Sequence, residues 1–338
     1  MIPMVISILP LKRFQNAGVE LPEGLDLRFE EALTENEIIE VCRGADFLFV
    51  PAAYPEITRR VLENIPSVRM IQSSGAGYDK IDVESAAEFG IPVANSPGEN
   101  AMTVAEFTIA LLVALQRRIL LADREVKAGH YTAIREQFFG SGLGEIRDTC
   151  LGVIGLGAIG RQVARLARLL GAQVSYFDVR RPESEIEAEL QVRYMPVEAL
   201  LRSSDVISLH VPLTNKTKGL IGRQELQIMR PGSLLINTSR GEVVDQAALA
   251  EALESGHLGG AAIDTVSPEP PSSEHPLLNL SPEARDRLLI TPHIAGITRE
   301  AFNRTLREAL TNLIRVATGE APRHVVNGVP RAREPKKI

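Results

Sequence analysis

The chain has 338 residues, about twice the usual length of one domain, so two domains are expected. It carries 37 Lys and Arg against 43 Asp and Glu, a formal net charge of −6, which argues against a nucleic-acid partner. With 44% hydrophobic and 24% charged residues, and no apolar run long enough to span a bilayer, it has the composition of a soluble globular protein that does not bind a membrane.

The two cysteines, Cys42 and Cys150, stand in no CxxC or Cys/His pattern, so neither a disulfide framework nor a metal site is expected. The N-terminal segment MIPMVISILPLKRF has no basic residues before its apolar run and no small-residue cleavage site after it. We therefore expect a first strand there and not a signal peptide. Together these features predict a protein of the reducing cytoplasm.

The first hundred residues alternate short β-rich runs with helical stretches, a pattern typical of parallel sheets with crossover helices. We expect helices at 35–42, 55–64 and 82–89. The expected strands lie at 4–9, 25–30, 46–50, 69–74 and 91–95. This part of the chain should form one doubly wound α/β sheet.

The same alternation restarts after Cys150 and predicts a second, larger sheet. Its expected helices include 159–170 and 245–255. Its expected strands lie at 151–155, 173–177, 205–211, 233–237, 259–264 and 287–292.

Two long helices are expected to join the halves, because apolar residues recur at helical spacing over 100–118 and again over 298–318. The second helix would return the chain to the first domain. We therefore expect a discontinuous domain of residues 1–100 plus 298–338 and a continuous one of residues 101–297. The charged, Pro-containing end of the chain is expected to fray, and no regulatory domain is expected after the last helix.

The segment LGVIGLGAIGRQVARLARLLGAQVSYFD places a GxGxxG motif between an apolar strand and an amphipathic helix. Gly155 would allow the tight turn, Gly157 the approach of a pyrophosphate, and Gly160 the close packing of helix on strand. Asp178 ends the next strand, 18 residues after Gly160, near the position of the acid that accepts hydrogen bonds from the adenosine ribose. The motif predicts a dinucleotide site, and a purely structural glycine turn is the alternative.

Asp178 also bears on the choice of cofactor, because a carboxylate there would repel the 2′-phosphate of NADP. NAD is therefore favoured. Arg180 and Arg181 follow directly, and they would pair with that phosphate if the loop turned Asp178 away, so NADP remains the alternative.

Three further segments carry candidate catalytic residues: INTSRGEVVD with Arg240, AAIDTVSPEP with Glu269, and TPHIAG with His293. With NSPGENAMTVAEF and SLHVPLTNKT, they closely resemble the D-isomer-specific 2-hydroxyacid dehydrogenase family over roughly residues 40 to 327. A lone His before a Gly-rich turn is usually structural, and an Arg after a strand usually lies at the surface. The indication comes from all these segments occurring together and in the family's order.

The resemblance implies a flavodoxin-like substrate domain and a Rossmann NAD-binding domain, with the active site in the cleft between them. It implies that Arg240 binds the substrate carboxylate and polarises the carbonyl, that Glu269 is the acid partner, and that His293 donates and accepts the proton. The residue types suit this chemistry. Hydride transfer at C2 of the acid requires proton transfer at the C2 oxygen, which an imidazole can perform. A carboxylate beside the imidazole favours its protonated form. The planar guanidinium of an arginine matches the two oxygens of a substrate carboxylate.

Further contacts are implied more weakly. The substrate carboxylate would be held by backbone N–H groups of Ser74, Gly75, Ala76 and Gly77, for which a simple tight turn is the alternative. Asp264 would hold the nicotinamide carboxamide, and His210 lies beside the cofactor or is a packing residue. The remaining cofactor contacts would be Thr103, Ala158, Ile159, Val211, Pro212, Thr217 and Thr238, and Asn237 is a further candidate.

The predicted function is NAD-dependent reduction of a small 2-keto acid such as glyoxylate or hydroxypyruvate. The loop VPAAYPEIT contains Tyr54 and has no base before Arg59, which disfavours a phosphorylated substrate. D-3-phosphoglycerate dehydrogenase is nevertheless the alternative among enzymes, and an NADH-sensing corepressor is the alternative from another class. The helix from Asn100 and the arm after it resemble the family's dimerisation region, so a homodimer is expected.

Overall fold

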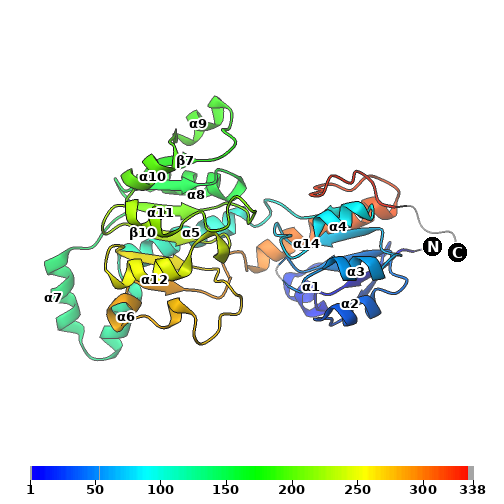
Figure 1. Ribbon diagram of the computed structural model, residues 1–338, viewed down its shortest axis with the longest axis horizontal. Coiled ribbons are helices and arrows are strands. Elements are labelled where there is room, and N and C mark those ends of the chain that lie inside the picture. The colour runs from blue at the N-terminus through cyan, green and yellow to red at the C-terminus, as the bar shows by residue number, and fades with distance from the viewer. Residues whose placement is uncertain (1, 53, 334–338) are drawn as a thin grey trace. The chain divides into compact units, whose positions relative to one another are not determined.

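The computed structural model describes residues 2–52 and 54–333 and divides the chain into two compact units (Figure 1). The smaller unit comprises residues 1–100 and 297–338, and the larger comprises residues 101–296. Both are α/β units built on a parallel sheet, as predicted. No helix in the described ranges is long and apolar enough to cross a membrane.

The smaller unit contains a five-stranded parallel sheet with strand order β2-β1-β3-β4-β5. This is the order of flavodoxin-like sheets. All residues of β3 and β4 are buried, as expected for parallel strands that helices cover on both faces. The strands are β1 (Met4–Ser7), β2 (Asp26–Phe29), β3 (Phe47–Val50), β4 (Met70–Ser73) and β5 (Val93–Ala94).

Five helices accompany this sheet, and capping side chains determine where several of them begin. The predicted helix at 55–64 begins only at Arg59, because the hydroxyl of Thr58 accepts the Val61 N–H and ends the extended segment before it. Helix α1 was not predicted. It ends at Ala17, and its C-cap Gly18 has a left-handed φ of 64°. The helices are α1 (Leu11–Ala17), α2 (Glu35–Val41), α3 (Arg59–Asn64), α4 (Val83–Glu88) and α14 (Arg299–Ala317).

The larger unit contains a seven-stranded parallel sheet with strand order β12-β11-β10-β9-β6-β7-β8. Read from β8, this is the Rossmann order with one more strand at the far edge. The two-residue strand β8 was not predicted. The strands are β6 (Cys150–Ile154), β7 (Gln173–Phe177), β8 (Arg193–Tyr194), β9 (Val206–Leu209), β10 (Leu234–Asn237), β11 (Gly260–Ile263) and β12 (Leu288–Ile290).

Helices cover both faces of the larger sheet, and α5 packs directly against α8 (Figure 1). The apolar residues of α5 and α8 share one core cluster with β6 and β7. The helices are α5 (Ala101–Gln116), α8 (Ala158–Leu169), α9 (Ser184–Leu190), α10 (Val197–Ser203), α11 (Arg223–Ile228), α12 (Gln246–Glu254) and α13 (Pro282–Arg285), with 3-10 turns η1 (Gly241–Val243) and η2 (Pro276–Leu278).

Two further helices, α6 (Ile119–Lys127) and α7 (Tyr131–Ser141), form an arm that projects from the larger unit (Figure 1). No residue of α6 is buried, and Ile134 is the one buried residue of α7. Apolar side chains are nevertheless frequent on the arm, and Phe139 is 73% exposed. The arm therefore has no core of its own and presents an uncovered apolar surface.

Candidate active site

Apart from Thr103 on α5, the predicted site residues of the larger unit follow the ends of six strands of one parallel sheet. Because the carboxyl ends of parallel strands lie at the same edge, these residues gather along that edge. The glycine motif follows β6, Asp178 follows β7, and His210 follows β9. Arg240 follows β10, the loop of Asp264 and Glu269 follows β11, and His293 follows β12.

The glycine motif adopts a turn that requires glycine at two of its three positions. Gly155 has φ of 96°, and a Cβ there would lie 2.4 Å from the carbonyl oxygen of His210. A Cβ on Gly160 would lie 1.9 Å from the carbonyl oxygen of Gly155. At Gly157, by contrast, a Cβ would meet no atom within 4 Å. Gly155 and Gly160 are needed for packing, whereas Gly157 leaves an open face.

That open face lies at the N-terminus of α8, whose first two residues are Ala158 and Ile159. Gly157 is the N-cap and supplies no capping side chain, so the first N–H groups of the helix are available to an anion. The backbone and the open side of Gly157 therefore fit the pyrophosphate of a dinucleotide.

Asp178 joins the end of β7 to the glycine loop. Its Oδ2 accepts the Leu156 N–H at 2.7 Å, and its Oδ1 accepts the Arg180 N–H at 2.9 Å. Each carboxylate oxygen can accept a further hydrogen bond, so Asp178 can still receive ribose hydroxyls. The predicted acid is thus fixed next to the glycine loop.

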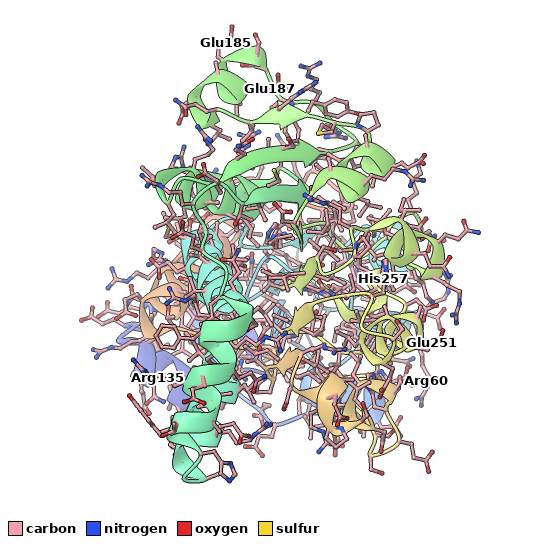
Figure 2. The ribbon with its side chains drawn as sticks, turned by 90° about the vertical axis from the view of Figure 1, so that its left-hand side faces the viewer. Arg60, Arg135, Glu185, Glu187, Glu251 and His257 are labelled. Carbon is pink, nitrogen blue, oxygen red and sulfur yellow. The ribbon has the colours of Figure 1, made fainter. Side chains whose placement is uncertain are left out.

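Arg181, which was considered as a partner for a 2′-phosphate, is held elsewhere. Its guanidinium forms two 2.8 Å hydrogen bonds to the carboxylate of Glu187. Glu187 lies on α9 and is labelled in Figure 2. It also lies over the ring of Tyr194, 5.4 Å from the centroid. The hydrogen bonds from Arg181 and from Tyr176 lower the pKa of Glu187 to about 2. This cluster holds Arg181 in an ion pair and so opposes NADP binding.

The loop after β9 is held together by the hydroxyl of Thr217. This hydroxyl donates to the Pro212 carbonyl at 2.6 Å and accepts the Thr214 N–H at 2.8 Å. His210 precedes this loop, and its Nε2 lies 2.8 Å from the Ser208 hydroxyl. Burial lowers the pKa of His210 to about 3, so the ring is neutral at physiological pH.

Two of the three predicted threonines lie at interior positions of the larger unit. Thr103 and Thr238 are both buried. The Thr238 hydroxyl lies 3.2 Å from that of Thr108, which itself donates to the Val104 carbonyl. Thr238 is therefore the donor between the two hydroxyls, and its position is fixed by α5.

Arg240 lies in a turn that Asn237 organises. The side-chain amide of Asn237 donates to the Arg240 carbonyl at 2.8 Å, and its Oδ1 accepts from the N–H and hydroxyl of Ser239. The Arg240 guanidinium donates to the Ser239 carbonyl at 2.9 Å. Gly241 follows, and a Cβ there would lie 2.4 Å from the carbonyl carbon of Val266. The loop of Arg240 thus packs directly against the loop of Glu269.

Glu269 and His293 form a pair across the loops after β11 and β12. Nδ1 of His293 lies 3.1 Å from each carboxylate oxygen of Glu269, so the Nδ1–H group donates to the carboxylate. The side chain of His293 is 28% exposed and that of Glu269 is 43% exposed, so solvent or substrate can reach the pair. Across the described ranges, Nε2 of His293 has no hydrogen bond. This nitrogen is the one available to exchange a proton with a ligand.

His293 adopts a left-handed backbone conformation with φ of 55°, which is uncommon for a residue other than glycine. Asp264 stabilises this turn. Its carboxylate accepts the hydroxyl of Thr291 at 2.6 Å. It also accepts the N–H groups of Ile294 and Ala295, both at 2.9 Å.

Asp264 was predicted to hold the nicotinamide carboxamide, and its role in the His293 turn was not predicted. The spacing of 29 residues between Asp264 and His293 gave no signal for it. Asp264 is only 1% exposed. Its binding to the carboxamide stays a prediction.

The predicted substrate loop lies in the smaller unit, after β4. Three of its four carbonyl groups accept hydrogen bonds: Gly75 accepts from Ser96 N–H, Ala76 from the Asn95 amide, and Gly77 from the Ser73 hydroxyl. Ser74 donates its N–H to Val50. Among the described residues, the N–H groups of Ala76 and Gly77 have no partner. The loop can therefore offer two backbone donors to a carboxylate.

Comparison with known proteins places the chain in one family. The NAD binding domain of the D-isomer specific 2-hydroxyacid dehydrogenases matches residues 109–295. A glyoxylate reductase of Korarchaeum cryptofilum is 39% identical over 304 residues, which cover 90% of this chain and 89% of that one. A D-3-phosphoglycerate dehydrogenase of Archaeoglobus fulgidus is 36% identical, with 90% of this chain and 55% of that one covered.

A solved structure leads to the same family. The D-lactate dehydrogenase of Aquifex aeolicus, crystallised with NAD and lactic acid, has a TM-score of 0.81 and 28% sequence identity to this chain. The match covers 94% of this chain and 96% of that one.

Proposed function

Because the chain belongs to the D-isomer specific 2-hydroxyacid dehydrogenase family and is an NAD-dependent oxidoreductase, we propose that it reduces a small 2-keto acid such as glyoxylate or hydroxypyruvate. The Glu269–His293 pair carries this proposal, since it offers a proton donor supported by a carboxylate. We assign NAD binding to residues 101–297 and substrate binding to the rest of the chain. The match of the NAD binding domain to 109–295 supports this division.

In the proposed reaction, bound NADH supplies the hydride that reduces C2 of the keto acid. His293 donates a proton from Nε2 to the carbonyl oxygen, which becomes the hydroxyl of the product. Glu269 holds Nδ1–H and stabilises the positively charged ring before transfer. Arg240 binds the substrate carboxylate through its guanidinium, and the N–H groups of Ala76 and Gly77 provide further donors.

The test is oxidation of NADH, and separately of NADPH, with glyoxylate, hydroxypyruvate, pyruvate, longer 2-keto acids and phosphohydroxypyruvate. We expect turnover of a small keto acid with NADH. Turnover confined to phosphohydroxypyruvate would contradict the proposed substrate. No turnover with any acid, together with tight NADH binding, would favour the corepressor alternative.

D-3-phosphoglycerate dehydrogenase is the second candidate, because relatives of that name match most of this chain. The two arginines of α3 that could bind a phosphate, however, already form ion pairs with glutamates. Arg59 contacts Glu63 and Glu88, and Arg60 contacts Glu35. These ion pairs favour the unphosphorylated substrate.

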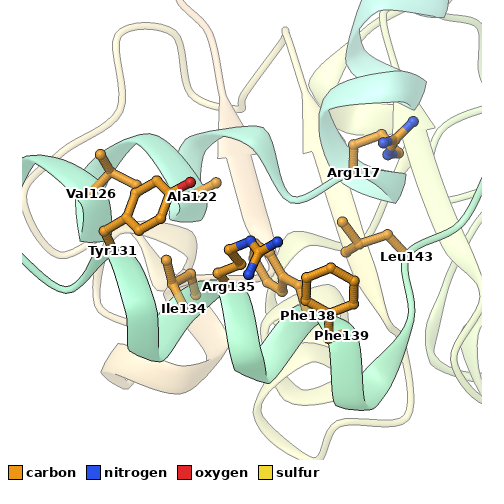
Figure 3. Close-up of a pocket in the computed structure, with 9 residues that line it drawn as sticks. All are labelled: Arg117, Ala122, Val126, Tyr131, Ile134, Arg135, Phe138, Phe139 and Leu143. Atoms are coloured by element: carbon orange, nitrogen blue, oxygen red, sulfur yellow. The ribbon is translucent and has the colours of Figure 1, made fainter.

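We also propose a homodimer formed through the α6–α7 arm. Apolar side chains of both helices line a hollow of about 440 Å³ (Figure 3). Its wall includes Val126, Tyr131, Phe138 and Phe139. Exposed apolar surface of this kind is typical of protein interfaces. A second copy of the chain would bury it.

The dimer is tested by light scattering after gel filtration. We expect a dimer mass for the native chain, and a monomer for Phe139→Asp, because a charge would have to be buried in the interface. Leu169→Asp introduces the same charge at an equally exposed apolar position of α8, outside the arm, and serves as the control that should stay dimeric. A monomeric native chain would contradict the proposal.

The cytoplasm is the proposed location. Cys42 and Cys150 are both free thiols, which suits a reducing compartment.

A further inference from the structure

The loop that carries Glu269 has no regular secondary structure between the end of β11 at Ile263 and the start of η2 at Pro276. Hydrogen bonds within a helix or sheet therefore cannot fix the carboxylate opposite His293. Contacts from neighbouring elements have to do so. The structure places two buried side chains outside the proposed catalytic set against the backbone of one residue of this loop, Ser267.

Gln246 is the first of these side chains. It is 8% exposed and is the first residue of α12, whose N-terminus is fixed by the Asp245 cap. Its Oε1 accepts the Ser267 N–H at 3.3 Å, and its Nε2 donates to the Gly241 carbonyl at 3.2 Å. Gln246 thus links the loop of Glu269 to the residue that follows Arg240.

His275 is the second side chain and is 4% exposed. Its Nδ1 accepts the Leu277 N–H at 3.3 Å, which leaves the proton of the neutral ring on Nε2. Nε2 lies 3.2 Å from the Ser267 carbonyl and donates to it. Both backbone polar groups of Ser267 are therefore hydrogen-bonded: its N–H group to Gln246 and its carbonyl to His275.

The packing of Gly241 supports the same arrangement. A Cβ at this position would lie 2.7 Å from the Ser267 nitrogen and 2.4 Å from the Val266 carbonyl carbon. The two loops can approach this closely only because residue 241 is glycine. Hydrogen bonds and close packing thus fix the Glu269 loop against the Arg240 loop at the same point.

We propose that Gln246 and His275 are positioning residues of the dehydrogenase, which fix the backbone of Ser267 on both sides so that Glu269, two residues later, meets Nδ1 of His293. This inference rests on the proposed roles of Glu269 and His293. Gln246 and His275 touch neither substrate nor cofactor in this account. They act through Glu269.

A double-mutant cycle tests the inference for Gln246 in the NADH-loaded enzyme. Gln246→Met keeps the length of the side chain and removes both hydrogen bonds. We expect kcat for keto-acid reduction to fall about tenfold or more, with KM and the Kd for NADH within about twofold of the native values. Gln224→Met, at an exposed position of α11, is the matched control and should leave all three constants unchanged.

The decisive comparison is Gln246→Met in the Glu269→Gln background. If Gln246 acts through Glu269, its substitution there should change kcat by less than about threefold. An equal loss of kcat in both backgrounds would show a merely stabilising role and overturn the inference. Native kcat in Glu269→Gln alone would instead overturn the proposed role of Glu269, so the two failures are distinguishable.

His275 is tested by rescue. His275→Met removes the donor to Ser267, whereas His275→Gln keeps an amide donor of similar reach. We expect His275→Gln to retain several times more kcat than His275→Met when both are assayed well below their unfolding temperatures. Equal kcat values for the two folded variants would overturn the role of this hydrogen bond.

Discussion

His293 combines an uncommon backbone conformation with the proposed proton transfer. Its φ of 55° is maintained by the Asp264 carboxylate, which accepts two N–H groups of the residues that follow. Strained backbone of this kind occurs often at functional sites. Asp264 thus orients the backbone of His293, and Glu269 orients its ring.

Asp178 allows a prediction about cofactor preference. In Asp178→Ser, the carboxylate that would repel a 2′-phosphate is lost, while a hydroxyl remains at the end of β7. We expect the ratio of kcat/KM for NADH to that for NADPH to fall at least about tenfold. Steady-state kinetics with both cofactors measures it. Arg181→Gln is the control, because Arg181 is engaged by Glu187 and its loss should leave the ratio within about twofold.

His210 allows a prediction about pH. Burial lowers its pKa from an ordinary 6.5 to about 3 in the folded chain, so between these values the unfolded chain binds one proton more. The free energy of unfolding should therefore fall as pH drops from about 6.5 towards 3, by up to about 1.4 kcal/mol per pH unit from this residue. His210→Gln, which cannot titrate, should show a shallower decline in urea unfolding. Identical slopes for the two proteins would contradict the assignment.

At the scale of elements, the glycine motif couples β6 to α8. In Gly160→Ala the new methyl group would lie 1.9 Å from the Gly155 carbonyl oxygen, so α8 has to move away from the strand. We expect the Kd for NADH, measured by fluorescence titration, to rise at least about tenfold. Gly140→Ala on α7 is the matched control, since its methyl group would meet nothing within 4 Å. Unchanged NADH binding in Gly160→Ala would contradict this account of the turn.

Long elements with a clear hydrophobic pattern were predicted to within a few residues. The helices expected at 100–118 and 298–318 are observed as α5 and α14, and the strand at 173–177 is β7. Two short elements were missed. Strand β8 has only two residues, too few for a periodic pattern to emerge. Helix α1 begins after Pro10 without a capping side chain, whereas α2 and α4, which are no longer than α1, have the caps Thr34 and Asp82. Their existence depends on tertiary packing against neighbouring elements.

The candidate site was predicted unevenly for a physical reason. Arg240 and His293 could be proposed from the sequence because their segments occur together with others in the order of a known family. Gln246 and His275 could not, because each acts through a hydrogen bond to one peptide group that lies about twenty and eight residues away in the sequence. Such contacts are visible only once the loops are folded.

At the scale of the whole molecule, the two units differ in what they determine. The strand order of the larger unit and its match to the NAD binding domain establish the cofactor and the reaction class. The smaller unit offers two backbone donors, which suit any 2-keto acid because all share the carboxylate. The choice among acids therefore depends on loop side chains.

The most direct test of the proposed mechanism is the kcat for glyoxylate or hydroxypyruvate reduction by NADH in the native chain and in His293→Ala. We predict a loss of at least about 100-fold, because general acid catalysis contributes that much or more, with the Kd for NADH unchanged. A His293→Ala enzyme that folds, binds NADH and turns over at the native rate would contradict the assignment of His293 as proton donor.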